Sequence, residues 1–165
     1  MDNIVLRTFG ITKKYKNFTA LSDINITIKK GQIYGLIGLN GAGKTTLMKV
    51  IAGLVHETSG SIELFGDTNK EEINKKRKKI GCLIEEPGLY RYKSVYTNLQ
   101  IQRLHKGIPG EDCIEKVLDL LNLKDFKNKK IKNLSVGIKQ RVGIAMAILG
   151  DPKFLILDEP INGLD

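Results

Sequence analysis

The residues best equipped for chemistry in this chain form the segment GLNGAGKTT, at positions 38–46. It matches the pattern G-x-x-x-x-G-K-[ST], with a continuous apolar run before it and a helix-like sequence after it. Glycines let the backbone curl so that successive N–H groups point at one anion. The N-terminus of the following helix adds its dipole at the same place. The segment therefore predicts a site for the phosphates of a nucleoside triphosphate.

Two side chains of this phosphate loop have predicted tasks beyond the backbone cradle. Lys44 can reach the β- and γ-phosphates, which makes it a predicted catalytic residue as well as a binding residue, and the Thr45 hydroxyl is a predicted ligand for Mg²⁺. The predicted nucleotide contacts of the loop are Gly38, Asn40, Gly41, Ala42, Gly43, Lys44, Thr45 and Thr46.

A second chemical feature is the acidic pair in FLILDE, Asp158 and Glu159. It follows a short apolar strand, and α/β sheets place their ligand chemistry at the C-terminal ends of strands. Asp158 is predicted to ligand Mg²⁺, and Glu159 to orient and polarise an attacking water. Acidic residues often follow exposed strands, so the pair alone is weak evidence of a site. Its occurrence after a phosphate loop makes the evidence strong. Together the two motifs predict nucleotide hydrolysis.

The elements that must position these groups follow from the hydrophobic pattern. Residues 4–12 and 20–28 alternate apolar and polar side chains, which predicts an antiparallel hairpin. Residues 31–38 are a continuous apolar run bounded by glycines, which predicts a strand buried on both faces. The next predicted elements are a helix over residues 44–54 and strands over residues 61–66 and 78–86.

The middle of the chain has helical spacing of apolar residues, and a short apolar strand over residues 154–157 follows it. The predicted helices cover residues 95–105, 112–123 and 135–149. Strands, a strand–loop–helix unit, a helical middle and a closing strand are the order of an α/β domain with a helical insertion.

Composition is that of a soluble globular protein, and no apolar run approaches the ~18 residues needed to span a bilayer. We therefore expect any membrane role to come through a partner chain. Cys82 and Cys113 lack metal-ligand spacing. Cys82 lies in an apolar run, which predicts a buried thiol.

The net charge of +9 keeps a nucleic-acid partner open as an alternative. Much of the excess lies in two basic runs, residues 75–79 and 124–132. The first follows a helix start and is predicted to be a solvated helix face. An anionic membrane surface, or an acidic remainder of a longer protein, would also account for the charge.

The segment LSVGIKQR, residues 134–141, resembles the LSGGQ-type signature of ABC ATPases. The following RVGIAMAILGDPKFLILDEPINGLD, residues 141–165, matches that family's pattern almost position by position. The resemblance covers Tyr15 to Asp165. It implies a P-loop NTPase core with an N-terminal antiparallel β region and a helical subdomain at about residues 90–134. It also implies that residues 1–165 form one ATP-binding domain, with ATP and Mg²⁺ as cofactors.

The resemblance adds further site residues. Tyr15 is implied to stack on adenine, although it can also be an ordinary edge-strand tyrosine. Ser135 and Gly137 are implied to reach the γ-phosphate held by the partner of a head-to-tail ATPase dimer. Ser135 can equally cap a helix. Residues 162–165, NGLD, resemble the loop that touches the partner beside the signature.

Two departures from the family pattern point to a branch. The signature has Val136 and Ile138 where a glycine and a glutamine are usual, and Glu85 stands where most members have glutamine. A carboxylate only accepts hydrogen bonds, so Glu85, a predicted catalytic and metal residue, would sense Mg²⁺ and γ-phosphate differently. The alternative is an exposed Glu85 without a role. These features resemble the branch that exports, or gives immunity to, antibiotic peptides such as bacitracin and lantibiotics.

The resemblance implies membrane-spanning permease partners, docked on the helical subdomain, and a cytoplasmic location on the inner face of the membrane. No nucleic-acid partner is expected, but an ABC protein acting on nucleic acid or ribosomes, and a module that binds ATP without turnover, remain alternatives.

The family also places a switch histidine and further strands after the acidic pair, whereas His56 and His105 both precede it. We therefore expect the chain to be C-terminally incomplete, truncated before the last strands, and compromised in hydrolysis.

Overall fold

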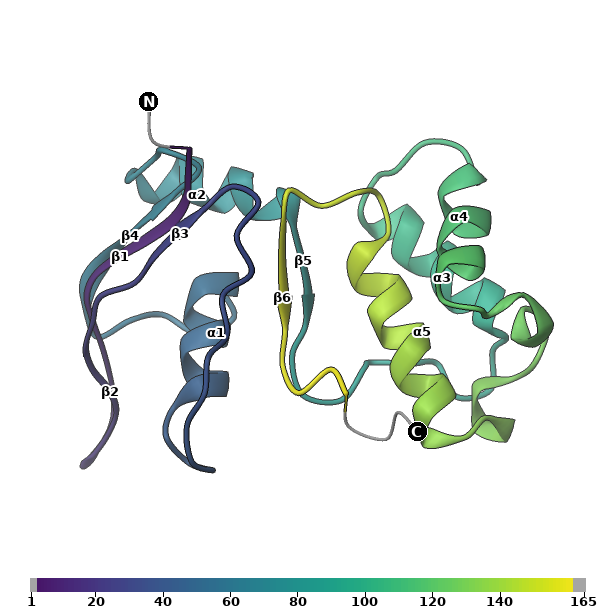
Figure 1. Ribbon diagram of the computed structural model, residues 1–165, viewed down its shortest axis with the longest axis horizontal. Coiled ribbons are helices and arrows are strands. Elements are labelled where there is room, and N and C mark those ends of the chain that lie inside the picture. Colours follow the sequence, from purple (N-terminus) through teal and green to yellow (C-terminus); the bar gives the residue numbers. More distant parts are fainter. Residues whose placement is uncertain (1–2, 162–165) are drawn as a thin grey trace. The chain divides into compact units, whose positions relative to one another are not determined.

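The computed structural model describes residues 3–161. The chain divides into two compact units, Met1–Lys78 (unit 1) and Lys79–Asp165 (unit 2), which are described separately. Figure 1 labels the helices and strands of both. The single domain predicted over residues 1–165 stays a prediction.

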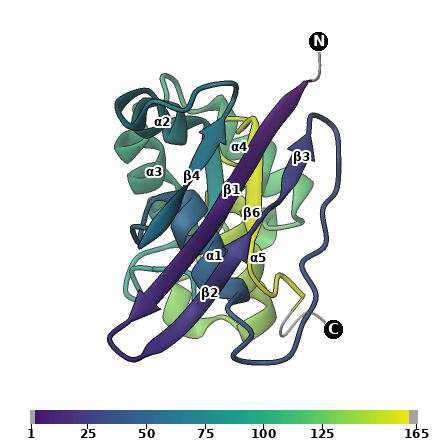
Figure 2. The same cartoon turned by 90° about the vertical axis from the view of Figure 1, so that its left-hand side faces the viewer.

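Unit 1 is built on an antiparallel sheet whose organising strand is β1, Ile4–Tyr15. Figure 2 looks onto this sheet, with β1 running diagonally across it. β1 pairs with β2 (Phe18–Ile24), β3 (Thr27–Lys29) and β4 (Ser59–Leu64). The predicted hairpin is thus confirmed. The pairing of β4 with β1 bridges a long stretch of chain, which local patterning cannot show.

Two helices complete unit 1. α1 (Lys44–Ala52) follows the phosphate loop, and α2 (Lys70–Lys76) continues into a 3-10 turn, η1 (Arg77–Lys79). The apolar side chains of α1 and the sheet form the core, and its buried members include Leu6, Ile11, Leu21, Leu47, Val50, Ile62 and Leu64.

The strand predicted over residues 31–38 is absent, and this prediction was wrong. The side chains of Ile33 and Ile37 are 98% and 96% exposed. A continuous apolar run forms a buried strand only where other strands pair with it, because every backbone N–H and C=O needs a partner. Among residues 3–161, no strand is paired with this run.

Unit 2 joins a parallel strand pair to a helical group (Figure 1). β5 (Ile80–Leu83) and β6 (Phe154–Leu157) are in register from Ile80↔Phe154 to Leu83↔Leu157. α5 (Val136–Ile148) packs on this pair. A Cβ built on Gly81 would lie 2.1 Å from the carbonyl oxygen of Ala147, so helix and strand are in backbone contact there.

The three long helices of unit 2 lie where the apolar spacing predicts them. α3 is Val95–His105, α4 is Asp112–Leu120, and the 3-10 turns η2 (Lys124–Phe126) and η3 (Ile131–Asn133) lead to α5. Their buried side chains form one cluster that includes Val95, Leu99, Ile114, Leu118, Leu123, Ile131, Val142 and Leu149. The α/β class with an N-terminal antiparallel region is confirmed. The boundary of a helical subdomain at residues 90–134 stays a prediction.

Two smaller expectations need correction. Cys82 is exposed, because Gly81 and Leu83 face α5 and strand alternation turns Cys82 to the other side. Arg77 was predicted to be solvated, but its guanidinium donates to the carbonyl oxygens of Ile51 and Val50 at the end of α1. No helix formed by residues 3–161 is long and apolar enough to cross a membrane.

Candidate functional site

The phosphate loop ends at Gly43, which is also the N-cap of α1. Its N-cap is a glycine, which has no side chain with which to cap the helix, and its first turn holds no acidic residue. The first N–H groups of a helix lack intrahelical partners and carry the positive end of the helix dipole. The arrangement therefore leaves the start of α1 suited to an external anion.

Glycine is required at two loop positions for different reasons. Gly41 and Gly43 have φ angles of 83° and 86°, in the left-handed region. A Cβ on Gly41 would meet open space, whereas one on Gly43 would lie 2.4 Å from the carbonyl oxygen of Ala20 in β2. Gly41 thus permits the backbone turn, and Gly43 also permits close packing of the loop on the sheet.

Lys44 lies folded over the loop. Its Nζ donates to the carbonyl oxygens of Gly38 and Leu39 at 2.8 and 2.9 Å. The N–H of Ala42 donates to the same Leu39 carbonyl at 3.1 Å and closes the turn. The Lys44 ammonium is therefore held against the curled backbone that the motif predicts to bind phosphate. The sequence does not show which carbonyl oxygens it contacts.

The other predicted nucleotide contacts of unit 1 lie near this loop or at the end of the hairpin. Thr45 and Thr46 are in the first turn of α1 and half-buried, and Asn40 is exposed. Tyr15 ends β1 with 44% of its surface exposed, and Lys13 Nζ lies 4.8 Å from its ring centroid. The predicted stacking of adenine on this ring stays a prediction.

In unit 2, the structure brings three predicted carboxylates to one sheet edge. The N–H of Asp158 donates to the Leu83 carbonyl at 2.8 Å, so β5 and β6 end together. Glu85 follows β5 by two residues, and Asp158 and Glu159 directly follow β6. This edge is where parallel sheets place ligand chemistry.

The three carboxylates differ in exposure and backbone conformation. Asp158 is 7% exposed, while Glu85 and Glu159 are exposed. Glu85 and Glu159 have φ angles of 61° and 44°. Left-handed conformations are uncommon for residues other than glycine.

Ser135 and Gly137 lie at the start of α5. Ser135 is its N-cap, and its Oγ accepts from the Ile138 N–H at 3.3 Å. Ser135 therefore caps α5, which is the alternative role that the sequence allowed. Contact with a γ-phosphate stays a prediction for both residues. The segment at 162–165 that resembles a partner contact lies outside the described residues.

Sequence reasoning missed two residues of α5 that touch the carboxylate segments. Gln140 Nε2 makes a long, 3.5 Å hydrogen bond to the Glu159 carbonyl oxygen. A Cβ on Gly143 would lie 2.6 Å from the Cβ of Pro87, so α5 packs closely on the segment after Glu85. Gln140 lies within the LSVGIKQR segment and Gly143 lies just after it. The resemblance of that segment to the family signature is the sequence feature that could have identified both residues.

The predicted metal ligands are hard oxygen donors: the Thr45 hydroxyl and the Glu85 and Asp158 carboxylates. Such donors suit Mg²⁺, which is commonly held by one or two carboxylates together with substrate phosphates. Within residues 3–161, no three His, Cys, Asp or Glu side chains gather as a metal-binding group. Thr45 lies in unit 1 and the two carboxylates lie in unit 2.

Comparison with known proteins gives consistent matches. The family model described as ABC transporter matches residues 21–162. The bacitracin transport ATP-binding protein of Enterococcus faecalis is 46% identical over 161 residues, which are 98% of this chain and 52% of that protein. The lantibiotic transport ATP-binding protein of Streptococcus pyogenes is 43% identical over 98% of this chain and 69% of its own length.

Solved structures agree with these sequence matches. An ATP-binding subunit of an ABC transporter superposes with a TM-score of 0.86 at 29% identity, over 98% of this chain and 68% of that one. A dimeric ATP-binding cassette bound to ADP and Pi gives 0.85 at 27% identity, over 98% and 76%. The chain spans about half the length of the first curated relatives that it matches. With its phosphate loop, signature segment and acidic strand end, this chain belongs to the ABC transporter family.

Proposed function

We propose that this chain is the ATP-binding and ATP-hydrolysing part of a transporter that exports antibiotic peptides or gives immunity to them. The observation that carries the proposal is the glycine-dependent phosphate loop at the uncapped start of α1, with Lys44 folded over it. The names of the bacitracin and lantibiotic relatives support the choice of cargo class.

The proposed binding roles follow from side-chain chemistry. The loop N–H groups and Lys44 bind the phosphates, Tyr15 stacks on adenine, and Thr45 and Asp158 hold Mg²⁺. When bound, Mg²⁺ would supply charge neutralisation for the phosphates. Glu159, exposed at the strand edge, accepts a hydrogen bond from the attacking water and orients it toward the γ-phosphate.

The remaining proposed roles concern communication with partners. Glu85 is a carboxylate, so it can respond to Mg²⁺ only by ligating the ion or by accepting hydrogen bonds from donors around it. Ser135 and Gly137 contact the γ-phosphate on a second ATPase copy, arranged head to tail. Permease subunits hold this assembly on the cytoplasmic face of the membrane, and their movement follows ATP-driven closure.

The first experiment measures Mg²⁺-ATP turnover over a range of protein concentrations, with Glu159→Gln as the inactive control. ATP binding is measured in parallel, with Lys44→Ala as the control. Turnover that rises faster than linearly and disappears in Glu159→Gln supports a dimeric ATPase formed by this chain. ATP binding without turnover supports the proposed phosphate site and shows that this chain alone does not hydrolyse ATP. A folded chain that binds no ATP would contradict the proposal.

A further inference from the structure

Two basic segments of unit 2 lie side by side. The N–H groups of Lys132 and Ile131 donate to the carbonyls of Arg91 and Lys93 at 2.9 and 3.0 Å, and the Val95 N–H donates to the Lys129 carbonyl at 3.1 Å. This pairing brings cations that are far apart in sequence onto two neighbouring backbone segments, and these cations together are called the basic ledge. Its members are Arg91, Lys93, Lys129, Lys130 and Lys132.

The ledge carries uncompensated charge. All five cations are exposed, and none of them forms an ion pair with any residue from 3 to 161. The neighbouring Lys124 and Lys127 differ, since they pair with Asp119 and Glu115. Ion pairing within the fold thus accounts for Lys124 and Lys127 and leaves the ledge open to an anionic partner.

The backbone beneath the ledge is fixed by buried groups. Asn98, 1% exposed, accepts from the Tyr90 N–H at 2.8 Å and donates to the Ser94 carbonyl at 2.8 Å. Ile131, also 1% exposed, anchors the other segment in the helical core. A surface on a fixed backbone loses less conformational entropy when it binds than a flexible tail does.

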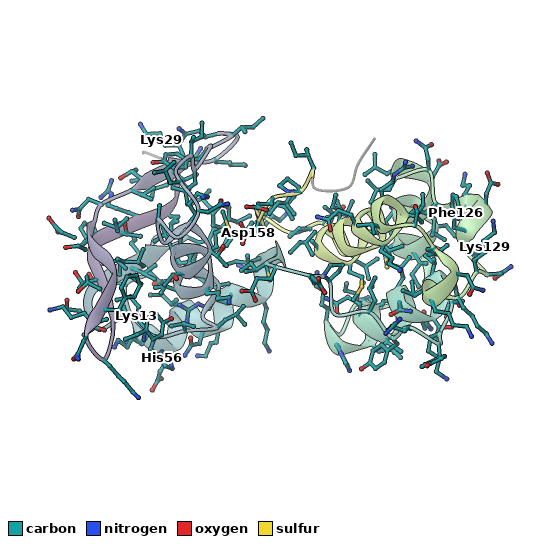
Figure 3. All side chains as sticks on the ribbon, turned by 90° about the horizontal axis from the view of Figure 1, so that it is seen from below. Lys13, Lys29, His56, Phe126, Lys129 and Asp158 are labelled. Atoms are coloured by element: carbon teal, nitrogen blue, oxygen red, sulfur yellow. The ribbon has the colours of Figure 1, made fainter. Side chains whose placement is uncertain are left out.

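Aromatic side chains accompany the cations. Tyr92 is 75% exposed, and Lys132 Nζ lies 5.4 Å from its ring centroid. Lys129 Nζ lies 4.8 Å from the ring centroid of Phe126, and Figure 3 shows this pair at the margin of unit 2. Lysine beside exposed tyrosine suits the headgroup layer of a membrane, where the cation meets lipid phosphates.

We propose that the basic ledge binds anionic phospholipid headgroups directly, through its five cations with Tyr92 at its edge. This goes beyond the proposed transporter role, in which the permease alone holds the chain at the membrane. Binding of the ledge to phospholipid needs neither nucleotide nor permease, so its test does not depend on the outcome of the ATPase experiments.

The test is co-sedimentation with phosphatidylcholine vesicles that contain phosphatidylglycerol, and with pure phosphatidylcholine vesicles, without nucleotide. The ledge variant replaces Lys93, Lys129, Lys130 and Lys132 with Gln. The charge-matched control replaces four other exposed lysines with Gln: Lys14, Lys30, Lys78 and Lys116. Circular dichroism checks both folds; if the ledge variant unfolds, Lys130→Gln/Lys132→Gln is compared with Lys30→Gln/Lys78→Gln.

The wild type is expected to bind the anionic vesicles and not the neutral ones. The ledge variant should lose about fivefold in partition coefficient per cation removed, and the control much less. Equal losses in both variants would show only a net-charge effect and overturn the proposal. So would unchanged binding by the ledge variant, or tighter, ledge-dependent binding of poly(U) RNA than of vesicles.

Discussion

At Gly43 a positive φ and a carbonyl 2.4 Å from the Cβ position coincide, while Gly41 has only the positive φ. We predict that Gly41→Ala lowers the free energy of unfolding by about 1–2 kcal/mol, the usual cost of a left-handed alanine, and weakens ATP binding. Gly43→Ala should cost more, because the loop must also move away from β2. Denaturant unfolding and titration with a fluorescent ATP analogue measure the two effects.

Gly31 is the matched control, with φ 78° and open space at its Cβ position, outside the phosphate loop. Gly31→Ala should lose stability as Gly41→Ala does while keeping its affinity for ATP. Equal loss of ATP affinity in both variants would mean that strain anywhere in unit 1, and not the loop itself, governs binding.

Residue-level prediction succeeded where a pattern encodes local geometry. The spacing of glycines and Lys44 predicts a curled loop before a helix, and α1 begins at Lys44. It failed where a contact depends on distant backbone. Nothing local shows that Arg77, within a basic run, reaches the carbonyls of Val50 and Ile51, or that Cys82 lies on the face of β5 turned away from α5.

Among the elements, α5 has its C-terminus capped by Lys106, the C-cap residue of α3. Lys106 Nζ donates to the carbonyls of Met146, Ala147 and Leu149 at 3.1–3.2 Å. Burial lowers the pKa of Lys106, against the charge interaction with Cys82, which raises it. We predict that Lys106→Met lowers the free energy of unfolding by about 1–3 kcal/mol, since three helix-end carbonyls lose a charged donor.

Chemical denaturation measures this loss, and Lys116→Met on the exposed face of α4 is the control. The control should stay within about 0.5 kcal/mol of the wild type, as surface substitutions usually do. If the two variants are equally stable, the cap contributes nothing and α5 is held by packing alone.

The junction of α3 and α4 should respond to acid. Tyr96 Oη donates to Glu111 Oε2 at 2.6 Å, and Gln100 Nε2 donates to Oε1 at 2.8 Å. Hydrogen bonds, from Tyr96 first and then Gln100, hold the pKa of Glu111 below its ordinary value. A lowered carboxylate pKa contributes stability above the unfolded pKa, and this contribution is lost as the pH falls through the folded pKa.

Tyr96→Phe should therefore be less stable than the wild type near neutral pH, and the difference should shrink as the pH falls below the ordinary glutamate range. NMR titration of the Glu111 carboxylate should show its pKa rising toward the ordinary value in the variant. A stability difference that stays constant down to acid pH would assign the effect to packing of the ring instead.

Helices were easier to predict than strands for a physical reason. The stripe of α4 buries its apolar face in a cluster shared with α3 and α5, so the sequence period carries the information there. A strand depends on neighbours supplied from elsewhere in the chain. Residues 31–38 have the composition of a buried strand and yet remain outside every sheet formed by residues 3–161.

At the scale of the whole molecule, that segment leaves large apolar side chains in water. Ile33, Ile37 and Leu39 are 98%, 96% and 85% exposed within a short stretch. Exposed apolar clusters of this kind drive association. We predict that the chain self-associates without nucleotide, and that Ile37→Lys shifts it toward the monomer in sedimentation velocity experiments.

Leu120, 70% exposed on α4, provides the matched control, because Leu120→Lys adds the same charge at an exposed apolar side chain outside residues 31–39. It should leave the association unchanged. Salt strengthens apolar association or leaves it unaffected, whereas it weakens charge-driven contacts, so a salt series separates the two. Association that persists in Ile37→Lys and appears only with ATP would instead be the ATP-dependent dimer, and the exposed segment would then play no part in it.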